Sequence, residues 1–326
     1  MGSEAGVILI AMVLAGCAAE ADRQWLDRHF LPPFFVSRRV YLLAASLARA
    51  GLAAFGVALA LVAPRIARFI TRVPPRTLFS DVARVLLAVV LALGASEFVL
   101  RHVFRQSSEE QSASQVRYRR RDPRLGWVFV PARAERAVTS GRGIEYAFDA
   151  AGYRVRRAGE AVNPKRPTIL FTGESIMVGQ GLRWEETVPA RVEALLGVQS
   201  ANLAVHGFAT DQSFMRLRAE LPRFRRPVAV VTLFTPGLFD RNLDDDRPHL
   251  GPGLVWLPPK PRWRLAIIAS WVVPYRSEAS IERGIAVTRS VLRATLDLAR
   301  SRGAESVIVV PQFLPEDATE RVLRRR

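Results

Sequence analysis

Two long apolar stretches in the first third of the chain restrict its fold more than any other feature. Residues 40–63 read VYLLAASLARAGLAAFGVALALVA, and residues 82–104 read VARVLLAVVLALGASEFVLRHVF. Each exceeds twenty residues, enough for an α-helix to cross roughly 30 Å of hydrocarbon. Because an unpaired backbone group is costly in lipid, such a stretch has to be helical. The sequence therefore predicts a membrane region over residues 1–105 with two to three transmembrane helices.

The first apolar stretch, residues 5–21 (AGVILIAMVLAGCAAEA), is shorter and leaves three interpretations open: a signal, a lipoprotein segment or a short transmembrane helix. It contains the sole cysteine, Cys17, within LAGC, which resembles the cleavage box of a lipoprotein. A secretory signal needs a basic amino-terminal region, whereas MGSEA carries Glu4 and no Lys or Arg. Chance occurrence of the box within an Ala/Gly-rich helix is therefore favoured.

Charge does not decide the topology, because the two loops between the apolar stretches carry equal numbers of arginines. With three spans and an inside amino terminus, everything after residue 105 faces the periplasm; with two spans it returns to the cytoplasm. We expect a multi-pass protein of the bacterial inner membrane with a periplasmic domain. The loop arginines are Arg23, Arg28, Arg38 and Arg39 in the first loop, and Arg65, Arg68, Arg72 and Arg76 in the second.

The charged residues Arg49 and Glu97 lie well inside the apolar stretches, where a charge is costly. Glu97 and Arg101 are four residues apart and share one face of a helix. Local pairing is therefore the favoured interpretation of Glu97, ahead of a proton path or a transport role.

The formal net charge of +17 comes almost entirely from arginine, since all but two of the 47 basic residues are arginines. They are dispersed and are not interleaved with aromatic residues as in a nucleic-acid-binding module, so no nucleic-acid partner is predicted. Attraction to anionic lipid headgroups explains the arginines beside the apolar stretches. The lipid bilayer is therefore the first partner that we expect.

After a polar linker at residues 106–115 (QSSEEQSASQ), apolar strand patterns alternate with helical ones. Alternation of this kind predicts a doubly wound, flavodoxin-like parallel sheet over residues 116–326, with a site at the carboxyl ends of its strands. Short apolar strands are expected at 168–172, 198–205, 228–234 and 305–310, and helices at 186–196, 211–221 and 278–302, the last followed by Gly303 as a cap.

A serine lies in a glycine-bracketed turn after the first expected strand. Residues 168–181 read TILFTGESIMVGQG. Ser175 is either the N-cap of a helix or a nucleophile at the carboxyl end of a parallel strand.

Five segments in collinear order resemble the membrane-anchored members of the SGNH, or GDSL-like, hydrolase family. The resemblance covers residues 116–326 and implies an SGNH-hydrolase-like α/β fold. It also implies a membrane-tethered serine acyl esterase or acyltransferase that acts on ester or acyl groups, expected to be those of the cell envelope. The segments are DPRLGW (122–127), FDAAGYR (148–154), ILFTGESIMVGQGL (169–182), ANLAVHGFATDQ (201–212) and FDRNLDDDRPHL (239–250).

The resemblance assigns roles to four residues. Ser175 matches the nucleophile, and Glu174 stands where the family has aspartate. Gly207 matches the glycine whose N–H binds the oxyanion. The family's oxyanion asparagine aligns with Gly237, so Asn242 is the candidate replacement, although bracing of the acidic loop is favoured for it.

The family's last block supplies a general base as Asp-x-x-His, and two histidines outside the membrane region are candidates for this base. His249 has the literal spacing in DRPH (246–249) but follows the third strand instead of the fifth, so ordering of its loop is favoured. His206 adjoins Gly207, but the sequence offers it no orienting carboxylate.

The fifth strand and the final block are therefore expected to be missing, either by truncation or in a degenerate, non-hydrolytic branch. Weak or no activity follows, since serine needs a base. The alternative is a non-catalytic envelope protein that binds a glycan or a partner subunit. No cofactor and no metal are expected, because the sequence has neither a Walker loop nor a His/Asp ligand cluster.

Overall fold

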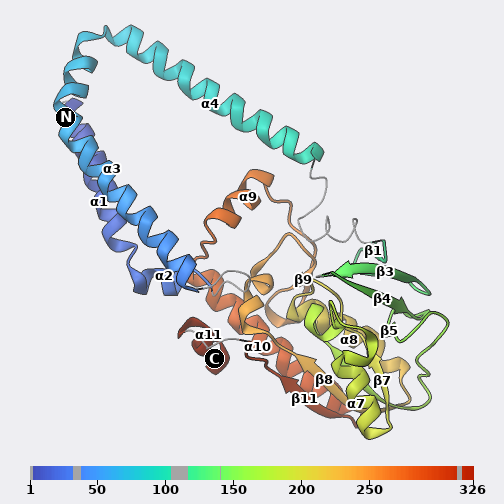
Figure 1. The fold of residues 1–326 in the computed structure, drawn as a ribbon. Coiled ribbons are helices and arrows are strands. Elements are labelled where there is room, and N and C mark those ends of the chain that lie inside the picture. Colours follow the sequence, from blue (N-terminus) through green and yellow to red (C-terminus); the bar gives the residue numbers. More distant parts are fainter. Residues whose placement is uncertain (1–2, 32–37, 104–116, 140, 314–317) are drawn as a thin grey trace. The chain divides into compact units, whose positions relative to one another are not determined.

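The computed structural model describes residues 3–31, 38–103, 117–139, 141–313 and 318–326 (Figure 1). Its contacts divide the chain into two units. One holds residues 1–103 together with residues 263–276, and the other is built mainly from residues 104–262 and 277–316. The expected linker at 106–115 lies outside the described residues.

The first unit is helical. Two of its helices are long and apolar enough to span a membrane, over 39–72 and 76–103, and the pair α1–α2, bent by 77°, adds a third if it forms one span. The predicted stretches at 40–63 and 82–104 are therefore helical throughout the part that is described. The helices are α1 (Ser3–Glu20), α2 (Arg23–His29), α3 (Arg38–Arg72), α4 (Pro75–Val103) and α9 (Arg264–Val272).

Helices α1 and α3 pack closely along their small residues. A Cβ added to Gly56 of α3 would lie 3.0 Å from the carbonyl oxygen of Ala11 in α1. Small residues that let two backbones approach in this way are typical of helix pairs in membranes. Arg49 of α3 donates from Nε to the carbonyl oxygen of Ala18 at 3.0 Å, which gives this charged residue a partner near the end of α1.

Glu97 of α4 is 7% exposed and receives three donors. Its carboxylate pairs with Arg101 at 2.7 Å, which confirms the expected local pair. It also accepts the backbone N–H groups of Arg264 and Leu265, each at 3.0 Å. These N–H groups begin α9 and have no partner within that helix, so Glu97 serves as the cap that the α9 sequence lacks.

The second unit contains a seven-stranded sheet with the order β11-β8-β6-β7-β5-β4-β3. Its strands are β3 (Ala134–Thr139), β4 (Arg142–Phe148), β5 (Arg154–Val155), β6 (Pro167–Thr172), β7 (Gln199–Asn202), β8 (Arg226–Leu233) and β11 (Glu305–Val309). Two short antiparallel hairpins accompany it: β1 (Arg119–Asp122) with β2 (Gly126–Phe129), and β9 (His249–Leu250) with β10 (Trp256–Leu257).

Only half of this sheet is parallel, so the prediction of a parallel doubly wound sheet is wrong for the other half. Strands β11, β8, β6 and β7 are parallel and correspond to the four predicted strands. Strands β3, β4 and β5 are antiparallel. Strand β3 reads AERAVT and is nowhere fully buried, so it lacks the apolar run that marks a core strand.

Helices cover both faces of the parallel half, as predicted. Leu170 of β6 packs on one face with Leu217 of α8 and Ala299 of α10. Its neighbour Phe171 points to the opposite face and packs with Met177 of α6, because successive side chains of a strand alternate. These helices are α6 (Ser175–Val178), α7 (Val188–Leu196), α8 (Thr210–Glu220) and α10 (Glu278–Ser301), and a last helix, α11, spans Ala318–Arg325.

We predict that Glu97→Ala loosens α9. The substitution removes the acceptor of two backbone N–H groups, so trypsin should cleave the detergent-solubilised chain after Arg264 several-fold faster. Asp81→Ala is the control, because it removes an exposed carboxylate of the same helix whose ion-pair partner among the described residues is the exposed Arg84. Equal cleavage rates in the two variants would contradict the capping role.

Candidate functional site

The carboxyl ends of three parallel strands meet where the strand order reverses. Strand β7 pairs with one side of β6 and β8 with the other, although β7 and β8 are consecutive parallel strands along the chain. Open α/β sheets bind ligands in the crevice outside such a reversal. Ser175 follows β6, Gly207 follows β7 and Thr235 follows β8, so the predicted residues come from the expected edge.

Gly173 makes the turn after β6 possible. Its φ is +150°, and an added Cβ would lie 2.8 Å from the Cβ of Leu233 and 3.2 Å from that of Met177. No side chain fits at that distance, so only glycine lets the turn pack against β8 and α6.

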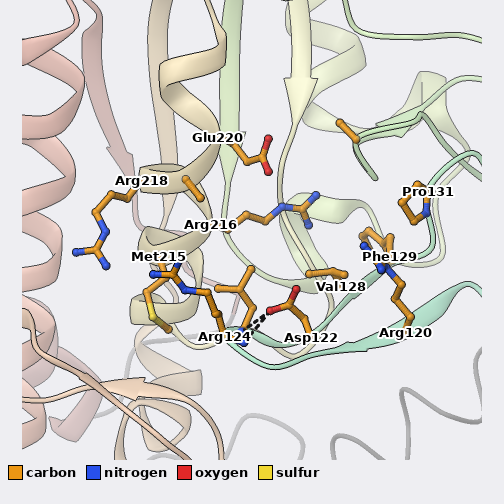
Figure 2. A pocket seen from close by; sticks show the side chains of 13 residues that line it. Arg120, Asp122, Arg124, Val128, Phe129, Pro131, Met215, Arg216, Arg218 and Glu220 are labelled. Atoms are coloured by element: carbon orange, nitrogen blue, oxygen red, sulfur yellow. Dashed lines mark hydrogen bonds between the residues drawn. The ribbon is translucent and has the colours of Figure 1, made fainter.

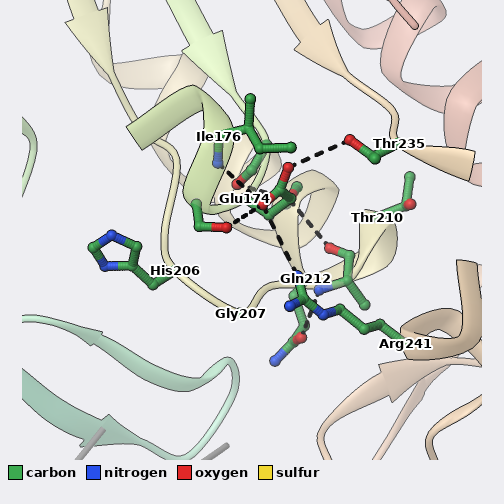
Figure 3. Close-up of polar contacts among 12 residues, drawn as sticks. Glu174, Ile176, His206, Gly207, Thr210, Gln212, Thr235 and Arg241 are labelled. Carbon is green, nitrogen blue, oxygen red and sulfur yellow. Dashed lines mark hydrogen bonds and ion pairs between the residues drawn. The ribbon is translucent and has the colours of Figure 1, made fainter. Parts of the chain in front are cut away.

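Glu174 caps α6, which settles the N-cap question raised by the sequence. Its side chain accepts the N–H of Ile176 at 3.1 Å, while Ser175 is the first residue of the helix. The same carboxylate accepts the hydroxyl of Thr235 at 3.3 Å and lies 3.9 Å from Nη1 of Arg241 (Figure 3). It is 6% exposed, so a buried carboxylate joins β6, α6 and the loop after β8.

Ser175 is partly exposed, and its hydroxyl donates to Oε2 of Glu174 at 2.5 Å. A serine hydroxyl that donates to a carboxylate has the first element of an activated nucleophile, namely an acceptor for its proton. The sequence did not predict this contact, because it assigned Glu174 only to the family's aspartate position.

Gly207 adopts φ of +76°, and its carbonyl oxygen accepts Nη1 of Arg247 at 2.8 Å. Within the described part of the chain, the backbone N–H groups of Gly207 and Ser175 donate to no acceptor. Neither N–H therefore has a partner among these residues that would compete with an oxyanion, and the sequence predicts that role for Gly207.

His206 lies in an aromatic core. Its ring is 2% exposed, lies 5.5 Å from Phe129 and 6.1 Å from both Tyr118 and Tyr146, and neither ring nitrogen has a hydrogen-bond partner among the described residues. Burial, with a smaller contribution from nearby arginines, holds its pKa well below the usual range, so the ring is neutral. In Figure 3 the ring lies apart from the Glu174 cluster.

His249 begins β9 and bonds through Nδ1 to the carbonyl of Arg247 at 2.9 Å. The next residue, Leu250, donates its N–H to Oδ2 of Asp211 at 2.7 Å. The imidazole therefore helps to order its own loop, which is the role that the sequence favoured for it.

Asn242 lies at the start of the acidic loop and ties it to helices α8 and α10, in line with the bracing role that the sequence favoured. Its Oδ1 accepts the N–H of Thr210 at 2.9 Å, and its Nδ2 donates to the hydroxyls of Thr210 at 3.0 Å and Thr288 at 2.9 Å. Both ends of the amide are engaged, which leaves little capacity for an oxyanion. Asn242 and Glu174 line a cavity of about 20 Å³, room for about one water molecule.

When the chain is compared with known proteins, no family model and no curated protein matches it. Within the described residues, no group of three or more His, Cys, Asp or Glu side chains could hold a metal ion. The SGNH-like interpretation therefore stays a prediction from the sequence motifs.

We predict that Glu174→Ala lowers the free energy of unfolding by about 1–3 kcal/mol, because it leaves buried N–H and hydroxyl donors without an acceptor. Thermal unfolding of the detergent-solubilised chain measures this loss. Glu185→Ala serves as the matched control, since the Glu185 side chain is 61% exposed and its ion pair with Arg156 is 3.7 Å long. The control should change the unfolding free energy by less than about 0.5 kcal/mol. Equal losses would show that Glu174 does not brace the turn.

Proposed function

We propose that the α/β unit is a slow, membrane-tethered serine acyl esterase or acyltransferase of SGNH-like type. The observation that carries this proposal is the hydrogen bond of 2.5 Å from the Ser175 hydroxyl to Glu174. It lies at the carboxyl edge of a sheet whose parallel strands follow the flavodoxin-like order β7-β6-β8-β11. Nucleophile, proton acceptor and two free N–H donors are the minimum set for acyl transfer.

In the proposed reaction, Oγ of Ser175 forms a bond to the ester carbonyl carbon while its proton passes to Glu174. The N–H groups of Ser175 and Gly207 bind the oxygen that becomes negative. The bond to the leaving alcohol then breaks, and that alkoxide takes the proton from Glu174. Water or a second hydroxyl repeats these steps on the acyl-serine, which releases a free acid or a new ester.

The reaction is slow because no histidine of the described residues is placed to act as its base. Neither ring nitrogen of His206 has a hydrogen-bond partner among these residues, and His249 bonds to the carbonyl of Arg247. The acceptor for the Ser175 proton is therefore a carboxylate, which is a weaker base than the imidazole that usually activates serine.

The substrate class in this proposal is an ester or acyl group of the cell envelope. Two helices are long and apolar enough to hold the chain in a membrane. An α/β unit anchored in this way would meet substrates at the membrane surface. The proposal also places the protein in a bacterial inner membrane, with the α/β unit in the periplasm. This location rests on the sequence resemblance.

A fluorophosphonate probe tests the nucleophile. The full chain in detergent should be labelled, Ser175→Ala should abolish labelling, and Ser290→Ala should leave it unchanged, because Ser290 is an exposed serine of α10. Glu174→Gln removes the proton acceptor and should slow labelling by roughly 10²–10⁴-fold. Labelling that persists in Ser175→Ala would exclude Ser175 as the nucleophile.

The second candidate function is a non-catalytic envelope protein that binds a glycan or a partner subunit. It is favoured by the position of His206, whose unpartnered ring nitrogens lie among aromatic rings and face no carboxylate of the described residues. A folded, full-length sample that the probe does not label would support this function over the catalytic one.

A further inference from the structure

A cavity of about 420 Å³ lies between the β1–β2 hairpin and helix α8 (Figure 2). None of the residues predicted for catalysis lines it. Its volume falls within the range of pockets that hold small organic ligands. Arg120, Arg124, Arg216 and Arg218 line it, with Asp122 and Glu220 as the carboxylates of the wall.

Arg216 is the unusual member of this wall. The residue is 4% exposed, and in Figure 2 its side chain lies among the other labelled side chains that line the cavity. Nη2 donates to the carbonyl oxygen of Gly152 at 2.9 Å, and the guanidinium lies 5.8 Å from the centre of the Tyr153 ring. Nη1 has no hydrogen-bond partner among the described residues.

Two other buried arginines have more hydrogen-bond or ion-pair partners than Arg216. Arg154 donates to the carbonyl oxygens of Val178, Gly179 and Leu182. Arg247 donates to a carbonyl and pairs with Asp244 at 3.2 Å. Arg216 has one carbonyl and no ion pair within the described residues; the carboxylates of Glu220, Asp149 and Asp122 favour its charge from a longer distance.

The two carboxylates of the wall are occupied elsewhere. Asp122 accepts the backbone N–H groups of Arg124 and Leu125 at 2.9 and 2.8 Å, as the dashed lines of Figure 2 show. Glu220 accepts the hydroxyl of Tyr153 and pairs with Arg223 at 2.8 Å. The cavity therefore presents an excess of positive charge to whatever enters it.

We propose that this cavity binds a phosphate ester of a small organic molecule. The phosphate pairs with Arg216, and the exposed Arg120 and Arg124 supply further donors; planar guanidinium groups suit phosphate oxygens. A phosphate also carries more negative charge than one carboxylate, so it balances the positive charge of three guanidinium groups better. Leu125, Val128 and Phe129 offer the apolar wall for the organic part.

Titration calorimetry of the full chain in detergent tests this proposal, at one fixed salt concentration. The probes are inorganic phosphate, glycerol 3-phosphate and, as the carboxylate control, succinate. Saturable binding of a phosphate probe is expected, tighter for glycerol 3-phosphate than for inorganic phosphate. Arg120→Ala and Arg124→Ala should each weaken it about tenfold. Arg225→Ala should not weaken it, because Arg225 is an exposed arginine of the same unit outside the cavity.

One more probe, short-chain phosphatidylglycerol, distinguishes a lipid headgroup from a soluble phosphate ester as the ligand. Preference for that lipid over glycerol 3-phosphate assigns the cavity to a lipid headgroup, and the reverse preference assigns it to a soluble ester. Absence of saturable binding, tighter binding of succinate, or an equal loss in Arg225→Ala would each overturn the proposal. Because Arg120 and Arg124 are exposed, their variants remain folded and the test does not depend on replacing Arg216.

Discussion

The buried carboxylate of Glu174 is the contact on which the arrangement of the site depends. Because Glu174 is only 6% exposed, its carboxylate needs hydrogen-bond donors on several sides. It receives them from Ser175 and Ile176 of α6 and from Thr235 in the loop after β8. These donors come from segments about sixty residues apart in sequence. Satisfying one buried charge therefore fixes the relative positions of two strand ends and the serine between them.

Buried arginines perform the same task for the antiparallel half of the sheet. Arg154 lies in β5 and donates to three carbonyl oxygens of the turn that follows α6, so β5 and the serine-bearing helix are held together. Its guanidinium stacks 4.6 Å from the Tyr146 ring in β4, which lets the charge lie in a core of aromatic rings. In this arginine-rich chain, some arginines are therefore structural, and composition alone does not separate them from those that face solvent.

The parallel half of the fold was predictable because its strands carry their signal locally. Strand β6 is a short apolar run that is buried over most of its length, β8 is apolar and buried at its carboxyl end, and α10 shows the matching amphipathic period. Strand β3 could not be found in the same way, because its burial comes from pairing with β4 and not from an apolar run. Ser175 and Gly207 were placed at the correct sheet edge by strand order, whereas the contacts of Thr235 and Arg241 with Glu174 are nonlocal and have no sequence pattern.

Glu174 has two roles, because the same carboxylate braces the turn and accepts the Ser175 proton in the proposed reaction. A carboxylate is a weaker base than the imidazole that usually activates serine. His206 does not supply that imidazole, because its neutral ring is enclosed by aromatic side chains and neither ring nitrogen has a hydrogen-bond partner among the described residues. In the proposed function, such a site holds the Ser175 hydroxyl in a fixed position but activates it weakly. Under that proposal, fixed geometry with weak activation favours slow chemistry on a bound acyl group over rapid turnover.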